Sequence, residues 1–241
     1  MSDMLLMLEG VHTHIGAYHI LHGVDLQVPR GQLTMLLGRN GAGKTTTLRT
    51  IMGLWQASQG RITFNGQDIT RRHTPAIAAL DIAYVPENMG IFADLTVKEN
   101  MLLAARQARH VRDMDEERLQ WIFKLFPAVE KFWNHPAGKL SGGQKQMLAV
   151  SRAIVEPRRL LIVDEPSKGL APVMIDNMIT AFQQLKASGV TILLVEQNIN
   201  FAKRLGDRVA VMDDGRVVHA GAMQALAEDE ALQQSLLGLA L

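Results

Sequence analysis

The sequence predicts an α/β fold with a mostly β N-terminal part and a helical segment inserted between two strands of a sheet. Three observations support this prediction. A strand-like run over Gln32–Leu37 leads through a glycine-rich loop into a helical pattern that begins near Lys44. Short aliphatic runs at Leu160–Val163 and Val190–Val195 alternate with segments of helical spacing, as in parallel βαβ units. Between residues 88 and 157, by contrast, apolar residues recur at helical spacing.

The first part of the chain is expected to form short strands. Its apolar residues alternate partly with polar ones, which is typical of strands with one buried face. Turns are predicted at Gly16 and at Pro29–Gly31. The expected strands are Leu5–Val11, Leu21–Val28, Arg61–Phe64 and Ile82–Val85.

The remainder of the chain supplies the helices and the last strands. A turn at Asp213-Asp214-Gly215 predicts a hairpin between Val209–Met212 and Arg216–Ala220. No internal repeat or low-complexity segment is present, and a single domain over residues 1–241 is expected. The expected helices are Val97–Arg109, Met114–Phe126 and Gly142–Val155 in the insert, and Met223–Leu236 at the end.

Charge and composition limit the kinds of partner. With 25 basic and 24 acidic residues the formal net charge is +1, which argues against a protein that wraps nucleic acid. The absence of cysteine excludes disulfides, thiolate metal sites and cysteine nucleophiles. No apolar run approaches the ~18 residues that span a bilayer, and no signal-peptide pattern opens the chain. A role at a membrane is therefore expected to depend on a partner.

The glycine-rich loop after Gln32–Leu37 predicts a nucleotide site. It fits the pattern G-x-x-x-x-G-K-[ST], in which glycines let successive backbone N–H groups face the phosphates. Lys44 adds a charge for the β- and γ-phosphates and counts among the expected catalytic residues, and the Thr45 hydroxyl is placed to ligate Mg²⁺. The alternative is a plain glycine turn between strand and helix. The expected ATP-binding residues of this loop are Gly38, Arg39, Asn40, Gly41, Ala42, Gly43, Lys44, Thr45 and Thr46.

Two carboxylates follow the aliphatic run Leu160–Val163. A buried parallel strand has continuous apolar residues, and ligands bind beyond its carboxyl end. Asp164 is therefore expected to hold Mg²⁺, and Glu165 to orient and deprotonate the attacking water. By themselves, two acids after a strand also fit a solvated turn. The phosphate loop upstream favours the catalytic interpretation.

The segment Leu140-Ser141-Gly142-Gly143-Gln144 separates one class of nucleotide-binding protein from the others. Together with the two motifs above, it resembles the signature of ABC ATPases, and the resemblance covers essentially the whole chain. It implies that the segment Ser141–Gln144 binds the γ-phosphate of ATP that is held by a second ABC ATPase subunit. A serine hydroxyl, glycine N–H groups and a helix dipole suit an anion. The segment also fits a helix-capping box, and both roles can hold together.

The resemblance assigns roles to residues outside these motifs. It implies that Tyr18 stacks on adenine, although a plain hairpin tyrosine is the alternative. It implies that Glu87, where the family usually has a glutamine, is a metal-side ligand. Ser167–Leu170 is similar to the loop that joins the two active sites across the dimer. Gln197 stands where most members have a histidine, and we expect it to be a catalytic γ-phosphate contact rather than only a loop cap.

Four segments are most similar to one ATPase of the branched-chain amino acid importers, or of related importers for urea and short amides. The resemblance implies the ABC ATPase fold, with an antiparallel β subdomain and a helical insert. It also implies an ATPase that uses ATP and Mg²⁺ and lies at the cytoplasmic face of the inner membrane. The implied partners are transmembrane permease subunits and a second ATPase subunit, and no nucleic acid is expected. The segments are Val85-Pro86-Glu87, Glu165-Pro166-Ser167, Gly169-Leu170-Ala171-Pro172 and Val195-Glu196-Gln197-Asn198.

The helical insert is expected to carry the contact with the membrane subunits. Candidate contact residues are Met89, Ile91 and Phe92, and ordinary core packing is their alternative role. An ATPase for lipid or lipopolysaccharide export, close in sequence, is an alternative to the importer. Soluble ABC proteins of DNA repair or chromosome structure carry long coiled coils, whereas only about a hundred residues separate Lys44 from Ser141. Kinases lack the signature, and no N-K-x-D pattern supports a GTPase.

Overall fold

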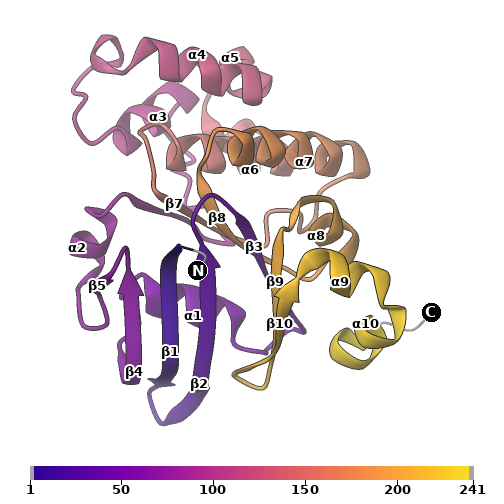
Figure 1. Cartoon of the computed structure of the whole chain (residues 1–241). Coiled ribbons are helices and arrows are strands. Elements are labelled where there is room, and N and C mark those ends of the chain that lie inside the picture. Colours follow the sequence, from indigo (N-terminus) through magenta and orange to yellow (C-terminus); the bar gives the residue numbers. More distant parts are fainter. Residues whose placement is uncertain (1–2, 239–241) are drawn as a thin grey trace.

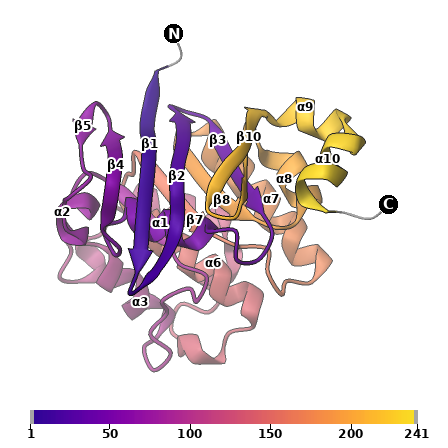
Figure 2. The same cartoon turned by 90° about the horizontal axis from the view of Figure 1, so that it is seen from below.

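The computed structural model describes residues 3–238, and their strands form two sheets. The N-terminal sheet is antiparallel with strand order β2-β1-β4-β5 (Figure 2). Its long β1–β2 hairpin turns at Gly16, as predicted, but both strands extend further toward the turn than the sequence indicated. The strands of this sheet are β1 (Met4–Ile15), β2 (Tyr18–Pro29), β4 (Ala57–Phe64) and β5 (Gln67–Asp68).

The central sheet has strand order β10-β9-β3-β8-β7-β6. Five of its strands are parallel, and β10 pairs antiparallel with β9. The strands that the sequence predicted here are all present. They are β3 (Leu33–Gly38), β6 (Ile82–Val85), β7 (Leu160–Asp164), β8 (Thr191–Glu196), β9 (Arg208–Asp213) and β10 (Arg216–Ala222).

Both faces of the central sheet are covered, and β3 shows how. All six of its residues are buried. Leu33, Met35 and Leu37 belong to an apolar core on the side of α6, α7 and the insert, whereas Leu36 belongs to a second core with the N-terminal sheet. A continuous apolar run is what a strand needs when side chains on both of its faces are buried. Figure 1 shows the two layers above and below the strands.

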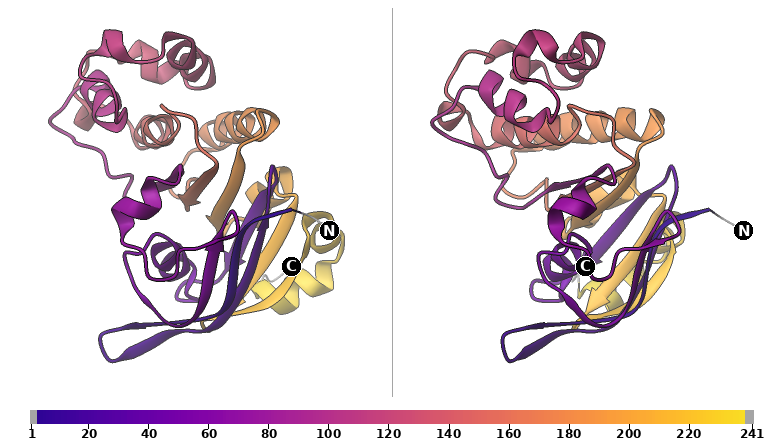
Figure 3. Two further views of the ribbon diagram at one scale, coloured as in Figure 1. Left: turned by 60° about the vertical axis from the view of Figure 1, so that its left-hand side comes forward. Right: turned by 90° about the vertical axis from the view of Figure 1, so that its left-hand side faces the viewer.

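Helices connect the parallel strands and form the insert. The insert helices α3, α4 and α5 lie at the opposite end of the molecule from the β1–β2 hairpin, and α6 lies between them and the central sheet (Figure 1, Figure 3). Among the helices of residues 3–238, none has the length and apolar composition needed to cross a membrane. The helices are α1 (Lys44–Ile51), α2 (Thr74–Ala78), α3 (Val97–Ala104), α4 (Glu116–Leu125), α5 (Pro127–Lys131), α6 (Gly142–Ala153), α7 (Pro172–Ala187), α8 (Ile199–Leu205), α9 (Met223–Glu228) and α10 (Glu230–Leu237).

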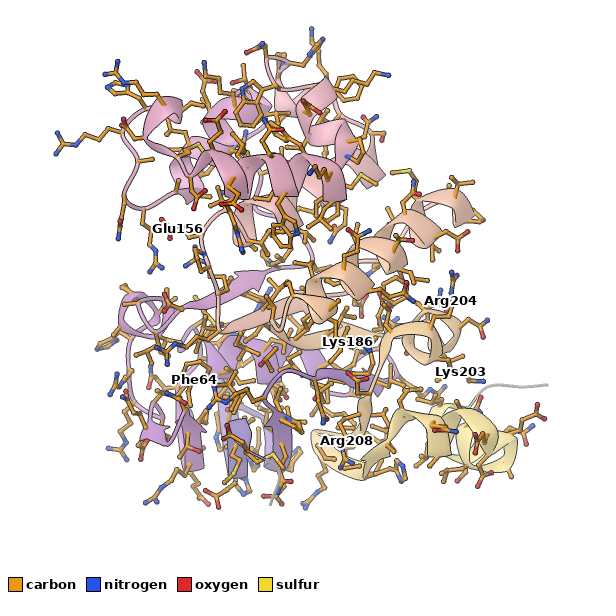
Figure 4. The ribbon with its side chains drawn as sticks, turned by 45° about the horizontal axis from the view of Figure 1, so that its top comes forward. Phe64, Glu156, Lys186, Lys203, Arg204 and Arg208 are labelled. Atoms are coloured by element: carbon orange, nitrogen blue, oxygen red, sulfur yellow. The ribbon has the colours of Figure 1, made fainter. Side chains whose placement is uncertain are left out.

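The first insert helix is shorter than the predicted Val97–Arg109. It ends at Ala104 because the next turn is held by side chains from elsewhere. The backbone N–H of Arg106 donates to Glu156 Oε1 at 2.7 Å, and its guanidinium Nε donates to Glu156 Oε2 at 2.9 Å. Figure 4 labels Glu156 between the insert helices and the sheet. A contact between residues 50 positions apart thus ends a helix whose local pattern would have continued.

The predicted final helix Met223–Leu236 is two helices. Asp229 interrupts it with an extended backbone (φ −109°, ψ 91°) and accepts a hydrogen bond from the Leu232 N–H at 2.8 Å, as an N-cap. Gln233 donates its amide to the Leu226 carbonyl at 2.7 Å, which satisfies the end of α9. The apolar spacing across the break is similar on both sides, so the periodicity alone did not reveal it.

Candidate functional site

The residues predicted to carry chemistry follow neighbouring parallel strands. In the register of the sheet, Leu37 of β3 lies beside Glu196 of β8, and Val195 lies beside Asp164 of β7. Because parallel strands end at one edge, the phosphate loop, the Asp164-Glu165 pair and Gln197 emerge together. This edge is where ligands bind in open α/β sheets.

The phosphate loop has a backbone that requires glycine. Gly38 has φ +150°, and a Cβ there would lie 2.4 Å from the Met212 carbonyl oxygen. Gly43 has φ +99° and forms the N-cap of α1, with Leu21 packed 3.0 Å from where its Cβ would be. These positions let the chain turn sharply from β3 into α1. The first turn of α1 therefore presents backbone N–H groups and a positive dipole end at the sheet edge.

Lys44 is buried at the start of α1 and lies over the loop. Its Nζ donates to the carbonyls of Gly38 and Arg39 at 2.8 and 3.0 Å. It is also 3.8 Å from Glu165 Oε1. Burial lowers the pKa of Lys44, and the nearby carboxylates of Glu165 and Asp164 oppose that shift. The loop thus places one compact positive charge at the centre of the site.

Thr45 and Asp164 are brought together as the sequence predicted. The Thr45 hydroxyl donates to Asp164 Oδ1 at 3.3 Å. Asp164 is only 1% exposed, and its second oxygen Oδ2 has no hydrogen-bond partner among the described residues. Burial raises the pKa of Asp164 to about 6, with the Thr45 hydrogen bond opposing the rise. An orphaned carboxylate oxygen beside a hydroxyl is chemically suited to a hard cation.

Glu165 has a backbone conformation that is uncommon for a non-glycine residue. Its φ is +48°, and its N–H donates to the Val195 carbonyl of the neighbouring strand at 3.0 Å. This conformation projects the carboxylate back toward the phosphate loop, where Lys44 lies. Backbone strain of this kind is often kept at functional sites because the surrounding structure holds it.

Gln197 joins three loops at the sheet edge. Its side-chain nitrogen donates to Glu165 Oε1 at 2.6 Å and to Asn40 Oδ1 of the phosphate loop at 2.7 Å. The residue after β8 thus contacts both the residue after β7 and the loop after β3. Sequence analysis expected Gln197 to contact the γ-phosphate. The structure places it beside the phosphate loop and also beside Glu165, the expected catalytic base.

Glu87 lies in a different contact from the one expected. Its Oε1 accepts a hydrogen bond from Lys168 Nζ at 2.5 Å, and within residues 3–238 no hydrogen bond joins it to Thr45 or Asp164. Its charge still reaches Asp164, where it contributes to the raised pKa. Lys168 also lies 3.5 Å from Glu165 Oε2. Sequence analysis included Lys168 in the Ser167–Leu170 loop but did not predict these two contacts.

Glu196 is a second residue that sequence analysis missed. It is 2% exposed, at the end of β8, and accepts hydrogen bonds from the backbone N–H groups of Ser167 at 2.9 Å and Gln197 at 3.2 Å. Burial raises its pKa, while these backbone donors act in the opposite direction. A carboxylate ending a buried strand, directly before Gln197, was the available signal. Glu196 ties the loop after β7 to the loop after β8.

The signature segment forms a helix start away from the phosphate loop. Ser141 caps α6: its hydroxyl accepts from the Gln144 N–H at 3.3 Å, and Gln144 Oε1 accepts from the Ser141 N–H at 2.9 Å. Gly143 packs against Met174 of α7, while a Cβ at Gly142 would meet open space. Across the described part of the chain, no hydrogen bond joins this segment to residues 38–46. The capping role is thus realised within the chain.

Tyr18 lies at the tip of the β1–β2 hairpin with 76% of its surface exposed. It pairs with Ile15, and further along the hairpin Thr13 pairs with Leu21. Leu21 packs against Gly43 of the phosphate loop, and Thr13 contacts Thr50 of α1. The hairpin therefore approaches the nucleotide loop, and adenine stacking by Tyr18 stays a prediction.

The fold and the residues at the sheet edge define an ATP-binding protein with a phosphate loop. The family model described as ABC transporter matches residues 21–168, and the chain belongs to this family. It is therefore an ATPase with the ABC ATPase fold, as its sequence predicted.

The chain is similar to two amino acid transport proteins along nearly its whole length. It is 37% identical to the high-affinity branched-chain amino acid transport ATP-binding protein BraG of Pseudomonas aeruginosa, covering 97% of this chain and 100% of that one. It is 35% identical to a probable branched-chain amino acid transport ATP-binding protein, LivF, of Archaeoglobus fulgidus, covering 97% and 99%. Neither relative favours the alternative of lipid or lipopolysaccharide export.

Solved structures agree with this assignment. The ATP-binding subunit of an ABC transporter matches with a TM-score of 0.82 and 29% identity, over 97% of this chain and 96% of that one. A dimeric bacterial ABC transporter cassette matches with a TM-score of 0.80 and 25% identity, over 90% and 98%. The arrangement of both sheets and the helices is thus that of an ABC cassette.

Proposed function

We propose that this chain is the ATPase subunit of a membrane importer for branched-chain amino acids or related small solutes. The observation that carries the proposal is the similarity to BraG over essentially the full length of both chains. The chain would lie peripherally at the cytoplasmic face of the inner membrane, held there by transmembrane permease subunits. None of the site residues contacts the solute in this proposal; their work is to bind and hydrolyse ATP.

Hydrolysis would use the groups at the sheet edge. The backbone N–H groups of the phosphate loop and the ammonium of Lys44 hold the phosphates of ATP and stabilise charge on them. Glu165 accepts a proton from a water molecule whose oxygen attacks the γ-phosphorus, and the bond from that phosphorus to the β,γ-bridging oxygen breaks to release ADP. Gln197 donates to the Glu165 carboxylate at 2.6 Å, and its second N–H, which donates to Asn40 in this structure, would leave Asn40 to reach the γ-phosphate.

The residues around Asp164 fit Mg²⁺. Asp164 Oδ2 is buried without a partner, and the Thr45 hydroxyl lies beside the same carboxylate. In residues 3–238, no group of three or more His, Cys, Asp or Glu side chains could hold a metal ion by itself. That is compatible with Mg²⁺, which is usually bound by one or two protein ligands together with substrate phosphates. When bound, Mg²⁺ supplies charge neutralisation on the phosphates, and Thr45 and Asp164 would hold it, with Glu87 near.

A second ATPase subunit would complete each site. Ser141 caps α6 with its hydroxyl, and Gly142 leaves open space at the same helix start. A helix start with these groups suits a γ-phosphate bound to the partner chain. The matched cassette described as dimeric supports this arrangement. The second subunit is either another copy of this chain, which gives a homodimer, or a related ATPase, which gives a heterodimer.

The helical insert would contact the permease. A groove of about 270 Å³ lies between β6 and the insert, lined by Tyr84, Pro86 and Met89 among others. Phe92 is 51% exposed on the same segment, with the Arg152 guanidinium 5.4 Å from the centre of its ring. Met89, which also lines the groove, and Ile91 pack partly against the apolar core on the insert side of the central sheet. We therefore place the permease contact at the groove and Phe92.

Cysteine cross-linking tests this placement cleanly because the chain has no native cysteine. Phe92→Cys, assembled with permease subunits from the same operon, should cross-link to them. Val218→Cys on β10 is the matched control, since both positions are 51% exposed, and it should not cross-link. With a further cysteine on α10 at Glu230, cross-links that form from Glu230→Cys and not from Phe92→Cys would refute the placement.

Uptake of radiolabelled leucine, arginine and urea by vesicles carrying the assembled transporter tests the solute class. Leucine uptake that needs ATP and is lost in Glu165→Gln is the expected result. Uptake of none of the branched-chain amino acids, with intact ATPase activity, would overturn the solute assignment and leave the ATPase assignment standing.

A further inference from the structure

Lys168 lies where the loop after β7 turns toward α7. Its backbone N–H donates to the Glu165 carbonyl at 3.2 Å, so both residues belong to one tight turn. Its side chain returns across that turn and reaches two carboxylates, Glu87 Oε1 at 2.5 Å and Glu165 Oε2 at 3.5 Å. One ammonium group thus bridges the loop after β6 and the expected catalytic base.

The Glu165 carboxylate is held differently at its two oxygens. Oε1 accepts from Gln197 at 2.6 Å and lies 3.8 Å from Lys44. Oε2 has Lys168 as its ion-pair partner, and within the described residues no other salt bridge reaches that oxygen. Without Lys168, rotation of the carboxylate about its last bond would be restrained from one side only.

Lys168 is itself fixed at both ends, although its side chain is 58% exposed. The preceding residue, Ser167, donates its backbone N–H to the buried Glu196 at 2.9 Å, which anchors the turn. The ammonium end is held by Glu87, whose hydrogen bond is the main cause of the raised pKa of Lys168. A lysine with a fixed base and a fixed tip loses little further freedom on contacting Glu165.

We propose that Lys168 is a positioning residue for Glu165, and that Glu87 holds Lys168 in place for that role. The charge at position 87 then acts on catalysis through Lys168, in addition to any contact with a cation. The inference depends on the ATPase activity of the chain and is independent of the transported solute.

Steady-state ATP hydrolysis by the purified full chain tests the proposal. Lys168→Met removes the charge and keeps the side-chain length; kcat should fall about fivefold, because Glu165 Oε2 loses its ion-pair partner and an exposed pair contributes only modestly. KM for ATP should stay within about twofold. Lys168→Arg, which keeps the charge, should restore most of kcat. Lys124→Met, a change of an exposed lysine on α4, is the matched control and should leave kcat unchanged.

A double-mutant cycle separates the role of Glu87 toward Lys168 from any other role. Glu87→Gln should lower kcat in the wild-type background and have a clearly smaller effect in the Lys168→Met background. Equal effects in both backgrounds would show that Glu87 does not act through Lys168 and would overturn that half of the proposal.

A charge exchange distinguishes positioning of Glu165 from a purely structural ion pair. The double variant Glu87→Lys, Lys168→Glu restores an ion pair between the two positions but puts a carboxylate next to Glu165. It should therefore remain at least as slow as Lys168→Met, with thermal unfolding unchanged. Wild-type kcat in the exchanged variant, or unchanged or higher kcat in Lys168→Met, would overturn the proposal.

Discussion

Gln197 offers a sharp test of the catalytic geometry. In the structure its amide donates to Glu165 Oε1 at 2.6 Å and to Asn40 Oδ1 at 2.7 Å. Gln197→Ala removes both donors and leaves the phosphate loop and Lys44 intact. ATP affinity should therefore change little, while turnover should fall because Glu165 loses a donor that orients it.

The expected size of the effect follows from the charge of the acceptor. A hydrogen bond to a charged group contributes about 1.5–3 kcal/mol. At 1.36 kcal/mol per tenfold in rate, this corresponds to a loss of roughly 10- to 150-fold in kcat. Loss of a preorganised donor at a reacting centre typically costs about 10²–10³-fold, so the upper part of the range is expected if the amide also contacts the γ-phosphate.

Gln197→His distinguishes a donor from a titrating group. An imidazole can supply one N–H to Glu165 or to the phosphate, so substantial activity should remain. Histidine changes charge near pH ~6.5, whereas glutamine does not titrate. The rate of the Gln197→His variant should therefore depend on pH between about 6 and 8 more strongly than the rate of the wild type.

The assay is steady-state ATP hydrolysis from pH 6 to 8, with nucleotide affinity measured in parallel by a fluorescent analogue. Gln183→Ala, a change of an exposed glutamine on α7, is the matched control and should behave as wild type. Wild-type turnover in Gln197→Ala would refute the catalytic role of Gln197 and leave Glu165 as the only group assigned to the proton transfer.

Three further outcomes are expected. Lys44→Ala should fold but lose ATP turnover, since a buried cation at 3.8 Å from Glu165 leaves the phosphate site; full hydrolysis would contradict the site assignment. Glu165→Gln should bind ATP, fail to hydrolyse it and form an ATP-dependent dimer by light scattering; a persistent monomer counts against the two-site sandwich. Because burial raises the pKa of Asp164 to about 6, the contribution of Asp164 to the free energy of unfolding without Mg²⁺ should fall by about 3 kcal/mol as pH rises from about 4 to above 6; in urea titrations, the difference between the wild type and Asp164→Asn should change with pH by that amount.

Local features of the site could be predicted because their geometry depends on residues close in sequence. The turn from β3 into α1 needs glycine at Gly38 and Gly43, and the positive φ angles of both confirm it. The cap of α6 needs only Ser141 and Gln144, three residues apart. The aliphatic run before Asp164 predicted a buried parallel strand, which β7 is. In each case the residue types and their spacing within one turn or strand determine the structure.

Helix ends were harder to predict because they depend on distant partners. The insert helix α3 stops at Ala104 because Glu156 takes the Arg106 N–H, and the sequence around Arg106 shows no stop signal. The break at Asp229 is a cap that the apolar spacing on either side conceals. The spacing of apolar residues indicates which face of a helix is buried, but it indicates less well where the helix ends.

What the sequence determined by itself is the chemistry of the site: a phosphate loop with Lys44, a carboxylate pair after a buried strand, and Gln197 after the next strand. Only the tertiary structure decided which of these groups touch. Gln197 meets Asn40 across 157 residues and Lys168 meets Glu87 across 81, contacts that exist because β8 lies between β3 and β7, and β6 lies beside β7. Parallel strands bring their carboxyl ends to one edge, and the side-by-side order of the strands, set by how the helices pack on both faces, selects the neighbours.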